Sequence, residues 1–241
     1  MKGSFSGARC IVPGCMKPAR TNPWAARSKT GRWCGRHWMR ARRHGDPQQQ
    51  WVQKKTLRSH IKYIEGLLKR DPTGKLERVA VQLYLNLKGH VEEVITDLKN
   101  GRMVPRWTAR GAYVLLQALS ETTPVESACA AGALFLLREW QASRFVSEDG
   151  WRGEFVRCWR KQVSKTACGS YWDERLNGGK GGAKAVYKEL PLRVVQEIGL
   201  LLLATYTPFA ARVIQHEVKE RNVGKTMKQA LDEGFAAIAG K

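Results

Sequence analysis

The sequence predicts an all-α fold, in which a domain of seven or eight helices over residues 51–241 follows a small N-terminal module over residues 1–50. From Trp51 onward, long segments with an amphipathic helical period alternate with chain breakers. Residues 1–50 show no sustained helical period and are rich in Gly, Pro, Arg and Trp. Three of the six cysteines also lie in this first stretch. The polar segment 46–50, Asp-Pro-Gln-Gln-Gln, marks the predicted boundary.

Apolar residues at helical spacing predict the first three helices of the large domain, over 57–69, 76–98 and 108–119. The first of these ends at Asp71 and Pro72, because a residue that precedes proline is kept out of the helical conformation. The second ends at Asn100 and Gly101, since glycine readily adopts the left-handed conformation that often follows a helix.

The strongest helix start in the chain is Thr123, followed by Pro124 and Glu126. A threonine cap, a proline in the first turn and a glutamate that bonds back to the cap form a capping box. The run 128–137 is hydrophobic on nearly all sides, so we expect it at the centre of the core. Further helices are expected over 150–163, 183–190, 192–206, 208–221 and 225–239.

The chain is strongly basic, with 42 Lys and Arg against 21 Asp and Glu and a formal net charge of +21. Residues 1–45 contain 11 Lys or Arg and no Asp or Glu. A field of this sign attracts polyanions, and nucleic acid is the usual partner. An acidic membrane surface or an acidic protein is a less common one. We therefore expect DNA, RNA or both as the partner, and neither a membrane nor a small-molecule substrate.

Four soft metal ligands occur at close spacing in the N-terminal module. Cys10 and Cys15 are separated by four residues, and Cys34 and His37 by two. Zn²⁺ binds four such ligands tetrahedrally in closed structural sites, where no position is left for a reacting water. The metal would replace the core that a short module cannot build. The alternative, ordinary reduced cysteines beside a surface histidine, is disfavoured by the close pairing.

The stretch CIVPGCMKPAR, followed after a spacer by GRWCGRHWMRARRHGDP, resembles the small treble-clef-like zinc modules of phage and mobile-element proteins. Those modules often accompany HNH-type homing endonucleases. The resemblance covers residues 9–47. It implies that Cys10, Cys15, Cys34 and His37 hold zinc and that the arginine-rich helix after His37 faces nucleic acid.

The nuclease half of that family's pattern is missing. An HNH centre needs a histidine general base with further metal-ligating His or Asn residues close to it. After His44, the next histidines are His60 and His90, in helical segments without a second Cys/His cluster. No serine–histidine or cysteine–histidine pair can be assigned either. We therefore expect no catalytic residues and a protein that is not an enzyme.

Ten cations are candidates for contacts to nucleic acid: Arg32, Arg36, Arg40, Arg42, Arg43, Arg157, Arg160, Lys161, Lys180 and Lys184. The first five flank Cys34, the last thiol of the predicted metal site, and have no acid nearby. Guanidinium groups match phosphate oxygens. A merely solvated basic face is the alternative. Trp33 and Trp38, which lie among these arginines, could stack on bases, but we favour packing against the zinc module.

The later cations lie in two segments. In 150–163, an aromatic and aliphatic stripe is expected to face the core, so that Arg157, Arg160 and Lys161 point elsewhere. The stripe consists of Trp151, Phe155, Val156 and Trp159. The segment 177–184 is a basic glycine loop that lacks the spacing of a P-loop. Its backbone amides and Lys180 fit a phosphate contact, and a flexible connection fits the sequence equally well.

The main functional prediction is a non-catalytic zinc-finger protein that binds nucleic acid. A zinc module joined to a basic helical domain is also similar in layout to the large subunit of type IV CRISPR effector complexes, which are antiviral-defence ribonucleoproteins. This similarity implies other subunits as partners and a target duplex as ligand. Alternatives are a phage or plasmid DNA-binding regulator, a nuclease with an unrecognised centre, and a protein that binds an acidic partner.

A cytoplasmic location is expected. Residues 1–14 lack the continuous apolar stretch of a secretory signal, and the scattered later cysteines do not form a secreted disulfide framework. The longest apolar run, residues 198–206, is about half the length needed to span a bilayer and is expected to form a buried core helix.

Overall fold

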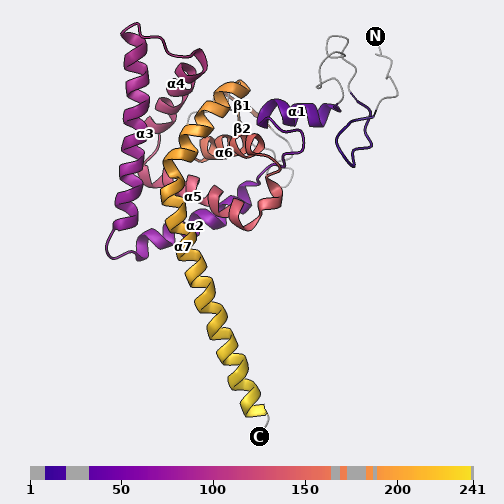
Figure 1. Cartoon of the computed structure of the whole chain (residues 1–241), viewed down its shortest axis with the longest axis vertical. Coiled ribbons are helices and arrows are strands. Elements are labelled where there is room, and N and C mark those ends of the chain that lie inside the picture. Colours follow the sequence, from indigo (N-terminus) through magenta and orange to yellow (C-terminus); the bar gives the residue numbers. More distant parts are fainter. Residues whose placement is uncertain (1–8, 20–32, 164–168, 173–182, 187–188, 240–241) are drawn as a thin grey trace.

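The computed structural model describes the chain except for residues 1–8, 20–32, 164–168, 173–182, 187–188 and 240–241 (Figure 1). At residues 54, 169–172, 183–186 and 224–239 it describes the backbone alone. The α-helices are α1 (Gly35–His44), α2 (Lys54–Arg70), α3 (Lys75–Lys99), α4 (Arg106–Ser120), α5 (Pro124–Trp140), α6 (Glu148–Val163) and α7 (Leu192–Ala239). A 3₁₀ turn, Ala142–Arg144, joins α5 to α6. The predicted all-α fold class is confirmed.

Helix α5 is the central element of the bundle, in contact with α2, α3, α6 and α7. It begins with the predicted capping box, in which Thr123 accepts a hydrogen bond from the Glu126 N–H and Glu126 accepts one from the Thr123 N–H. Nine of the ten residues in 128–137 are buried, and Phe135 is partly buried against the core. The predicted position of this run at the centre of the core is confirmed.

Helix α6 packs beside α5 through the predicted stripe, because Trp151, Phe155, Val156 and Trp159 are all buried. The Trp159 indole N–H donates to the Ser127 carbonyl oxygen at 3.2 Å, which satisfies the donor inside the core. The prediction that these aromatic side chains belong to the core is therefore confirmed.

Helix α7 replaces the three separate helices predicted over 192–206, 208–221 and 225–239. Pro208 lies inside it and does not end it. Tyr206 and Phe209, on either side of the proline, are both fully buried, and their packing outweighs the hydrogen bond that proline removes. The first half of α7 packs against the bundle, and the second half projects away from it (Figure 1).

By length and composition alone, the segment Leu192–Val223 of α7 could cross a membrane, and 44% of its apolar window is buried inside the fold. The run 198–206 contributes Ile198, Leu202 and Tyr206 to the core, as expected from the sequence.

The predicted helix over 183–190 is wrong. Strand β2 (Ala183–Val186) pairs antiparallel with β1 (Gly169–Trp172), with Gly169 opposite Val186 and Trp172 opposite Ala183. The glycine-rich sequence before β2 is a poor start for a helix, and pairing with the nearby strand β1 satisfies backbone groups of β2 instead.

Candidate metal centre and arginine helix

A tight turn brings Cys10 and Cys15 together. The Cys15 N–H donates to the Val12 carbonyl oxygen at 3.0 Å, and the Cys10 N–H donates to that of Lys17 at 3.0 Å. Gly14 has a φ of 72°, a left-handed conformation that glycine adopts without a side-chain clash. The turn that the sequence requires between the first two thiols is therefore present.

The second pair of ligands is set by the start of α1. Cys34 is the N-cap residue of this helix, and His37 follows within the first turn. The His37 Nδ1 atom lies 3.2 Å from the Cys10 Sγ and 3.5 Å from the Cys34 Sγ. The Sγ atoms of Cys15 and Cys34 are 3.9 Å apart. All four ligand atoms lie within 4.8 Å of one another.

These separations fit a single tetrahedral ion. Zn–S bonds of about 2.3 Å and Zn–N bonds of about 2.0–2.1 Å place two sulfur atoms ~3.8 Å apart and a sulfur and a nitrogen atom ~3.6 Å apart. The four predicted ligands could therefore hold one metal ion, with His37 binding through Nδ1. Among the described residues, no other group of three or more Cys, His or acidic side chains lies close enough to hold a metal ion.

The surroundings of Cys34 and His37 favour the protonation states that a metal requires. Burial opposes ionisation of Cys34, but hydrogen bonds from the His37 backbone N–H and from neighbouring groups outweigh it and lower the pKa of the thiol. Burial, and then the positive charge of Arg40 and Arg36, lowers the pKa of His37. A thiolate and a neutral imidazole are the forms that donate electron pairs to a metal.

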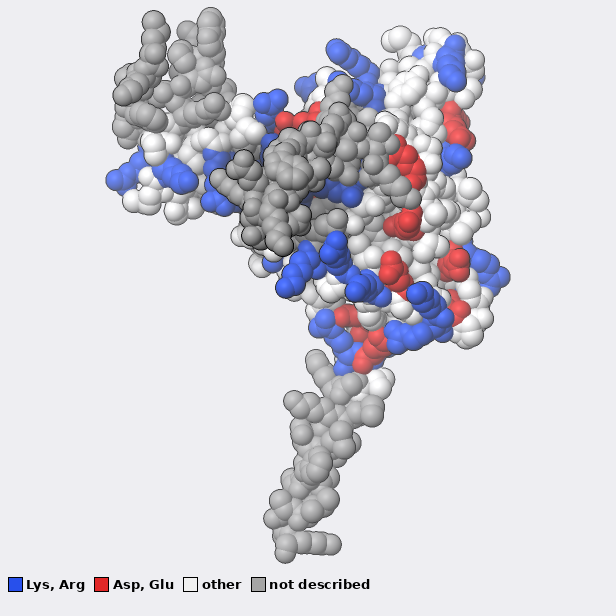
Figure 2. Space-filling view, turned by 180° about the vertical axis from the view of Figure 1, so that it is seen from behind, with Lys and Arg blue, Asp and Glu red and all other residues white. Residues whose placement is uncertain are grey.

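Three arginines line one face of α1, directly after the metal ligands. Arg36, Arg40 and Arg43 stand at positions i, i+4 and i+7, which share a helix face. Arg43 pairs with Glu189 at 2.9 Å, whereas among the described residues no carboxylate lies within ion-pair distance of Arg36 or Arg40. Burial, and then the charge of Arg36, lowers the pKa of Arg40. We call the described residues of the metal cluster together with α1, residues 9–19 and 33–44, the N-terminal arm, and Figure 2 shows Lys and Arg side chains along it.

The two tryptophans of the module have different surroundings, and the predicted packing against the metal cluster is present for Trp33. Trp33 packs against the cluster of Cys10, Val12 and Cys34. Trp38 is half-buried, and the Arg42 guanidinium lies over its ring, 5.5 Å from the centroid. Arg42 therefore lies on a different side of α1 from the row formed by Arg36, Arg40 and Arg43.

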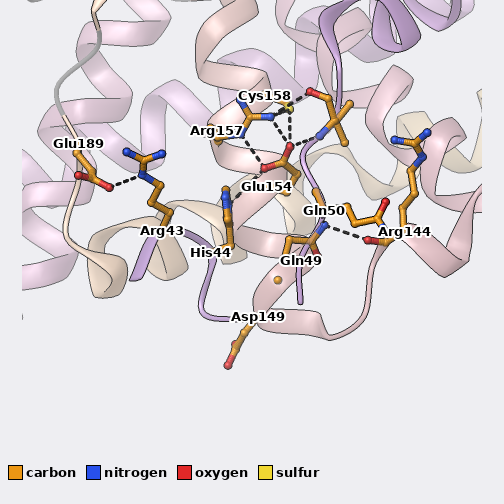
Figure 3. A network of polar contacts seen from close by, with 12 residues as sticks. Arg43, His44, Gln49, Gln50, Arg144, Asp149, Glu154, Arg157, Cys158 and Glu189 are labelled. Atoms are coloured by element: carbon orange, nitrogen blue, oxygen red, sulfur yellow. Dashed lines mark hydrogen bonds and ion pairs between the residues drawn. The ribbon is translucent and has the colours of Figure 1, made fainter. Parts of the chain in front are cut away.

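Arg157, predicted to face nucleic acid, is held inside the fold (Figure 3). Its guanidinium contacts Glu154 in a bidentate ion pair, with Nε 2.7 Å from Oε2, and also donates to the Val52 carbonyl oxygen at 3.2 Å. The side chains are 18% and 0% exposed, respectively. We therefore assign Arg157 a structural role, because its Nε and Nη2 atoms donate to groups of the same chain.

The same carboxylate joins the metal module to the bundle. Glu154 accepts a hydrogen bond from the Val52 N–H at 2.5 Å, and its Oε2 lies 3.3 Å from Nδ1 of His44, the last residue of α1. His44 is fully buried, and burial lowers its pKa to about 4 despite the nearby carboxylate. A neutral His44 is thus buried where α1 packs against α6.

Two glycines of α6 make this contact possible. A Cβ atom on Gly153 would lie 2.6 Å from the His44 Cα, and one on Gly150 would lie 2.6 Å from the Gln49 Oε1. Gln49 is itself buried and donates to the Arg144 carbonyl oxygen at 3.1 Å. Only glycine permits the end of α1 and the segment after it to approach α6 this closely.

The structure describes three of the five remaining predicted nucleic-acid contacts. Arg160 is half-buried and interacts within the fold, whereas Lys161 is exposed, with its pKa lowered by partial burial and by Arg157. Lys184 is placed opposite Tyr171 in the strand pair, by its backbone alone. Arg32 and Lys180 lie outside the described residues.

His44, Glu154 and Trp51 were not identified from the sequence as interaction partners. Trp51 is 42% exposed, and the Arg43 and Arg157 guanidinium groups lie over its ring, at 5.4 and 4.8 Å from the centroid. The one available signal was a glutamate within an otherwise apolar helical face, at position 154 beside the stripe of α6.

No family model matches this chain, and no curated protein or solved structure matches it.

Proposed function

We propose that the protein binds nucleic acid through its N-terminal arm, with zinc as the metal, and does not act chemically on the strand. The observation that carries this proposal is the row of Arg36, Arg40 and Arg43 on one face of a helix that the metal ligands begin. Guanidinium groups held in a row on a rigid helix are suited to successive phosphates of a backbone.

Zinc is favoured by the ligand set. Three cysteines and one histidine in a closed tetrahedral arrangement are typical of structural zinc sites. Such an ion fixes the start of α1 without taking part in a reaction. It thereby holds Arg36 and Arg40 in place, which reduces the conformational entropy that binding would otherwise cost.

The arm is also fixed at its other end. His44 and the segment after it are buried against α6 through Glu154, Arg157 and Gly153. A strand bound along α1 would therefore be held at a defined position relative to the basic bundle. Long-range attraction from the +21 net charge would add to the affinity at low salt.

The test is a salt titration of binding with the zinc-loaded full chain. Each phosphate neutralised by the protein releases counterions, so the logarithm of the affinity falls linearly with the logarithm of salt concentration. The single variants Arg36→Gln and Arg40→Gln should each flatten that slope by about one unit on two unrelated duplexes and on a single strand.

Lys99→Gln is the charge-matched control, because Lys99 is exposed at the end of α3, across the bundle from α1 (Figure 1). This variant should leave the slope unchanged. If Arg36→Gln and Arg40→Gln behave like Lys99→Gln, the arm is not the binding surface and the proposal fails. If one of these arginines instead reads a base, its loss would weaken binding only to duplexes that carry that base at one position.

The absence of catalysis is tested separately. No cleavage of single- or double-stranded DNA or RNA should appear with Mg²⁺, Mn²⁺ or Zn²⁺. Turnover that disappears when one acidic residue is replaced would instead establish a nuclease.

Membership of an RNA-guided complex is a narrower proposal that rests on the similarity of layout. Purification without nuclease treatment, followed by sequencing of the bound nucleic acid and identification of bound proteins, tests it. A guide RNA with partner subunits would support this placement, whereas duplex DNA from a defined operator would support a regulator.

A further inference from the structure

A pocket on the other side of the bundle from α1 is lined by two segments far apart in the sequence. The end of α2, the following turn and the start of α3 form one wall, and the middle of α7 forms the other (Figure 1). The cavity has a volume of about 480 Å³, within the range of small-ligand sites. Leu67 and Leu76 are buried beneath it.

Cations reach this pocket from three helices. Arg70 ends α2, Lys75 begins α3, and Arg212 and Lys219 belong to α7. Arg212 and Lys219 are seven residues apart and therefore share a face of α7, on which His216 lies between them. Figure 2 shows Lys and Arg side chains gathered at this end of the body, where α7 leaves it.

Both carboxylates of the pocket are already in use. Asp71 accepts hydrogen bonds from the Leu76 N–H at 2.9 Å and from the Thr73 hydroxyl at 2.6 Å, and these bonds lower its pKa to about 2. Glu220 accepts a hydrogen bond from the Tyr63 hydroxyl at 3.0 Å and pairs with Arg70 at 3.2 Å.

Three of the four cations have no such partner. Within the described part of the chain, no carboxylate lies within ion-pair distance of Lys75, Arg212 or Lys219. Like charges held around a concave surface repel one another, and a bound anion relieves that repulsion. The same positive charges repel a divalent cation. Both carboxylates that could bind such a cation already accept hydrogen bonds or pair with protein groups.

The chemistry of the donors favours phosphate over a single carboxylate. A tetrahedral phosphate has three or more acceptor oxygens that point in different directions, and here the donors come from different helices. The planar fork of Arg212 fits two of these oxygens, and the compact ammonium groups of Lys75 and Lys219 fit others.

We propose that this α7 pocket, formed by Arg70, Lys75, Arg212, His216 and Lys219, binds a phosphate group. The group belongs to a free nucleotide or to the end of a nucleic-acid strand, which share the same phosphate chemistry. The site is separate from the arm, so the proposal does not depend on nucleic-acid binding by α1.

The test uses the zinc-loaded full chain with Arg212 and Lys219 replaced together by Gln. Binding of inorganic phosphate and of a nucleoside monophosphate is measured by calorimetry at constant ionic strength. A short single strand with a 5′ phosphate is compared with the same strand bearing a 5′ hydroxyl. Each lost charge-assisted hydrogen bond should weaken phosphate binding roughly tenfold or more.

The matched control is Arg58→Gln with Lys62→Gln, which removes the same charge from exposed positions of α2 outside the pocket. This control should bind phosphate, the monophosphate and both strands as the wild type does. If the pocket variant itself does not fold, Lys75→Gln compared with Lys55→Gln gives the same contrast at exposed positions.

The two sources of phosphate give different results. Binding of the monophosphate that depends on Arg212 and Lys219, with no effect of the 5′ phosphate on the strand, identifies a free nucleotide. Pocket-dependent preference for the 5′-phosphorylated strand identifies a strand end. Equal losses in the pocket variant and in its α2 control, for every probe, would overturn the proposal.

Discussion

Replacing Glu154 by Gln tests the buried contact that holds the metal module on the bundle. Glutamine keeps the shape of the side chain and an oxygen for the Val52 N–H. It removes the negative charge opposite Arg157 and turns an amide N–H₂ group toward a donor. The change therefore isolates the charge of Glu154 from its packing.

The expected loss of stability is about 3–5 kcal/mol. Two unit charges ~4 Å apart interact by about 4 kcal/mol at an effective dielectric constant of 20. Removing one member of a buried pair costs about 3–5 kcal/mol because the other charge is left uncompensated. Both values apply here, since the Glu154 side chain is 0% exposed and that of Arg157 only 18%.

The control lies on the same helix. Glu148 pairs with Arg138 at the surface, where the two side chains are 59% and 37% exposed. Glu148→Gln should therefore cost less than about 1 kcal/mol. Urea unfolding of the zinc-loaded protein at neutral pH gives the free energy of unfolding of each variant.

A double variant separates charge from hydrogen bonding. Glu154→Gln combined with Arg157→Met keeps the acceptor for the Val52 N–H and leaves no buried charge, so much of the lost stability should return. A Glu154→Gln protein within about 1 kcal/mol of Glu148→Gln would refute the assignment of a structural role to this pair.

Three further predictions concern the arm. Purified protein should contain one zinc ion per chain by elemental analysis. Cys34→Ala should lose the zinc, and Cys129→Ala, in the buried core, should retain it. A folded, reduced wild-type protein without bound metal would contradict this prediction. The pKa of His44 is about 4 in the folded state and about 6.5 in the unfolded chain. Its contribution to the free energy of unfolding is therefore complete above pH 6.5 and is lost as the pH falls toward 4, by up to ~3 kcal/mol. His44→Gln should flatten this part of the stability profile and His216→Gln, at an exposed position, should not. Gly153→Ala should destabilise the protein, because the added Cβ would meet the His44 backbone. Its control Gly66→Ala, with open space around it, should stabilise α2 by roughly 0.5–1 kcal/mol. Equal effects of the two changes in urea unfolding would mean that α1 is not packed against Gly153.

The sequence alone determined the features that depend on neighbouring residues. The four candidate ligands follow from two short spacings and a turn around Gly14, and the start of α5 follows from Thr123 and Glu126. The buried stripe of α6 follows from helical periodicity, because residues on one face of a helix share one environment.

Tertiary structure decided what depends on partners distant in the sequence. Arg157 looked like a surface cation, but Val52, 105 residues away, and the buried Glu154 hold it inside the fold. Arg43 meets Glu189 across 146 residues, and no local pattern encodes that separation. Pro208 signals a break, yet the burial of Tyr206 and Phe209 keeps α7 continuous. Local propensities amount to about 1–3 kcal/mol, which the burial of two large aromatic side chains can exceed.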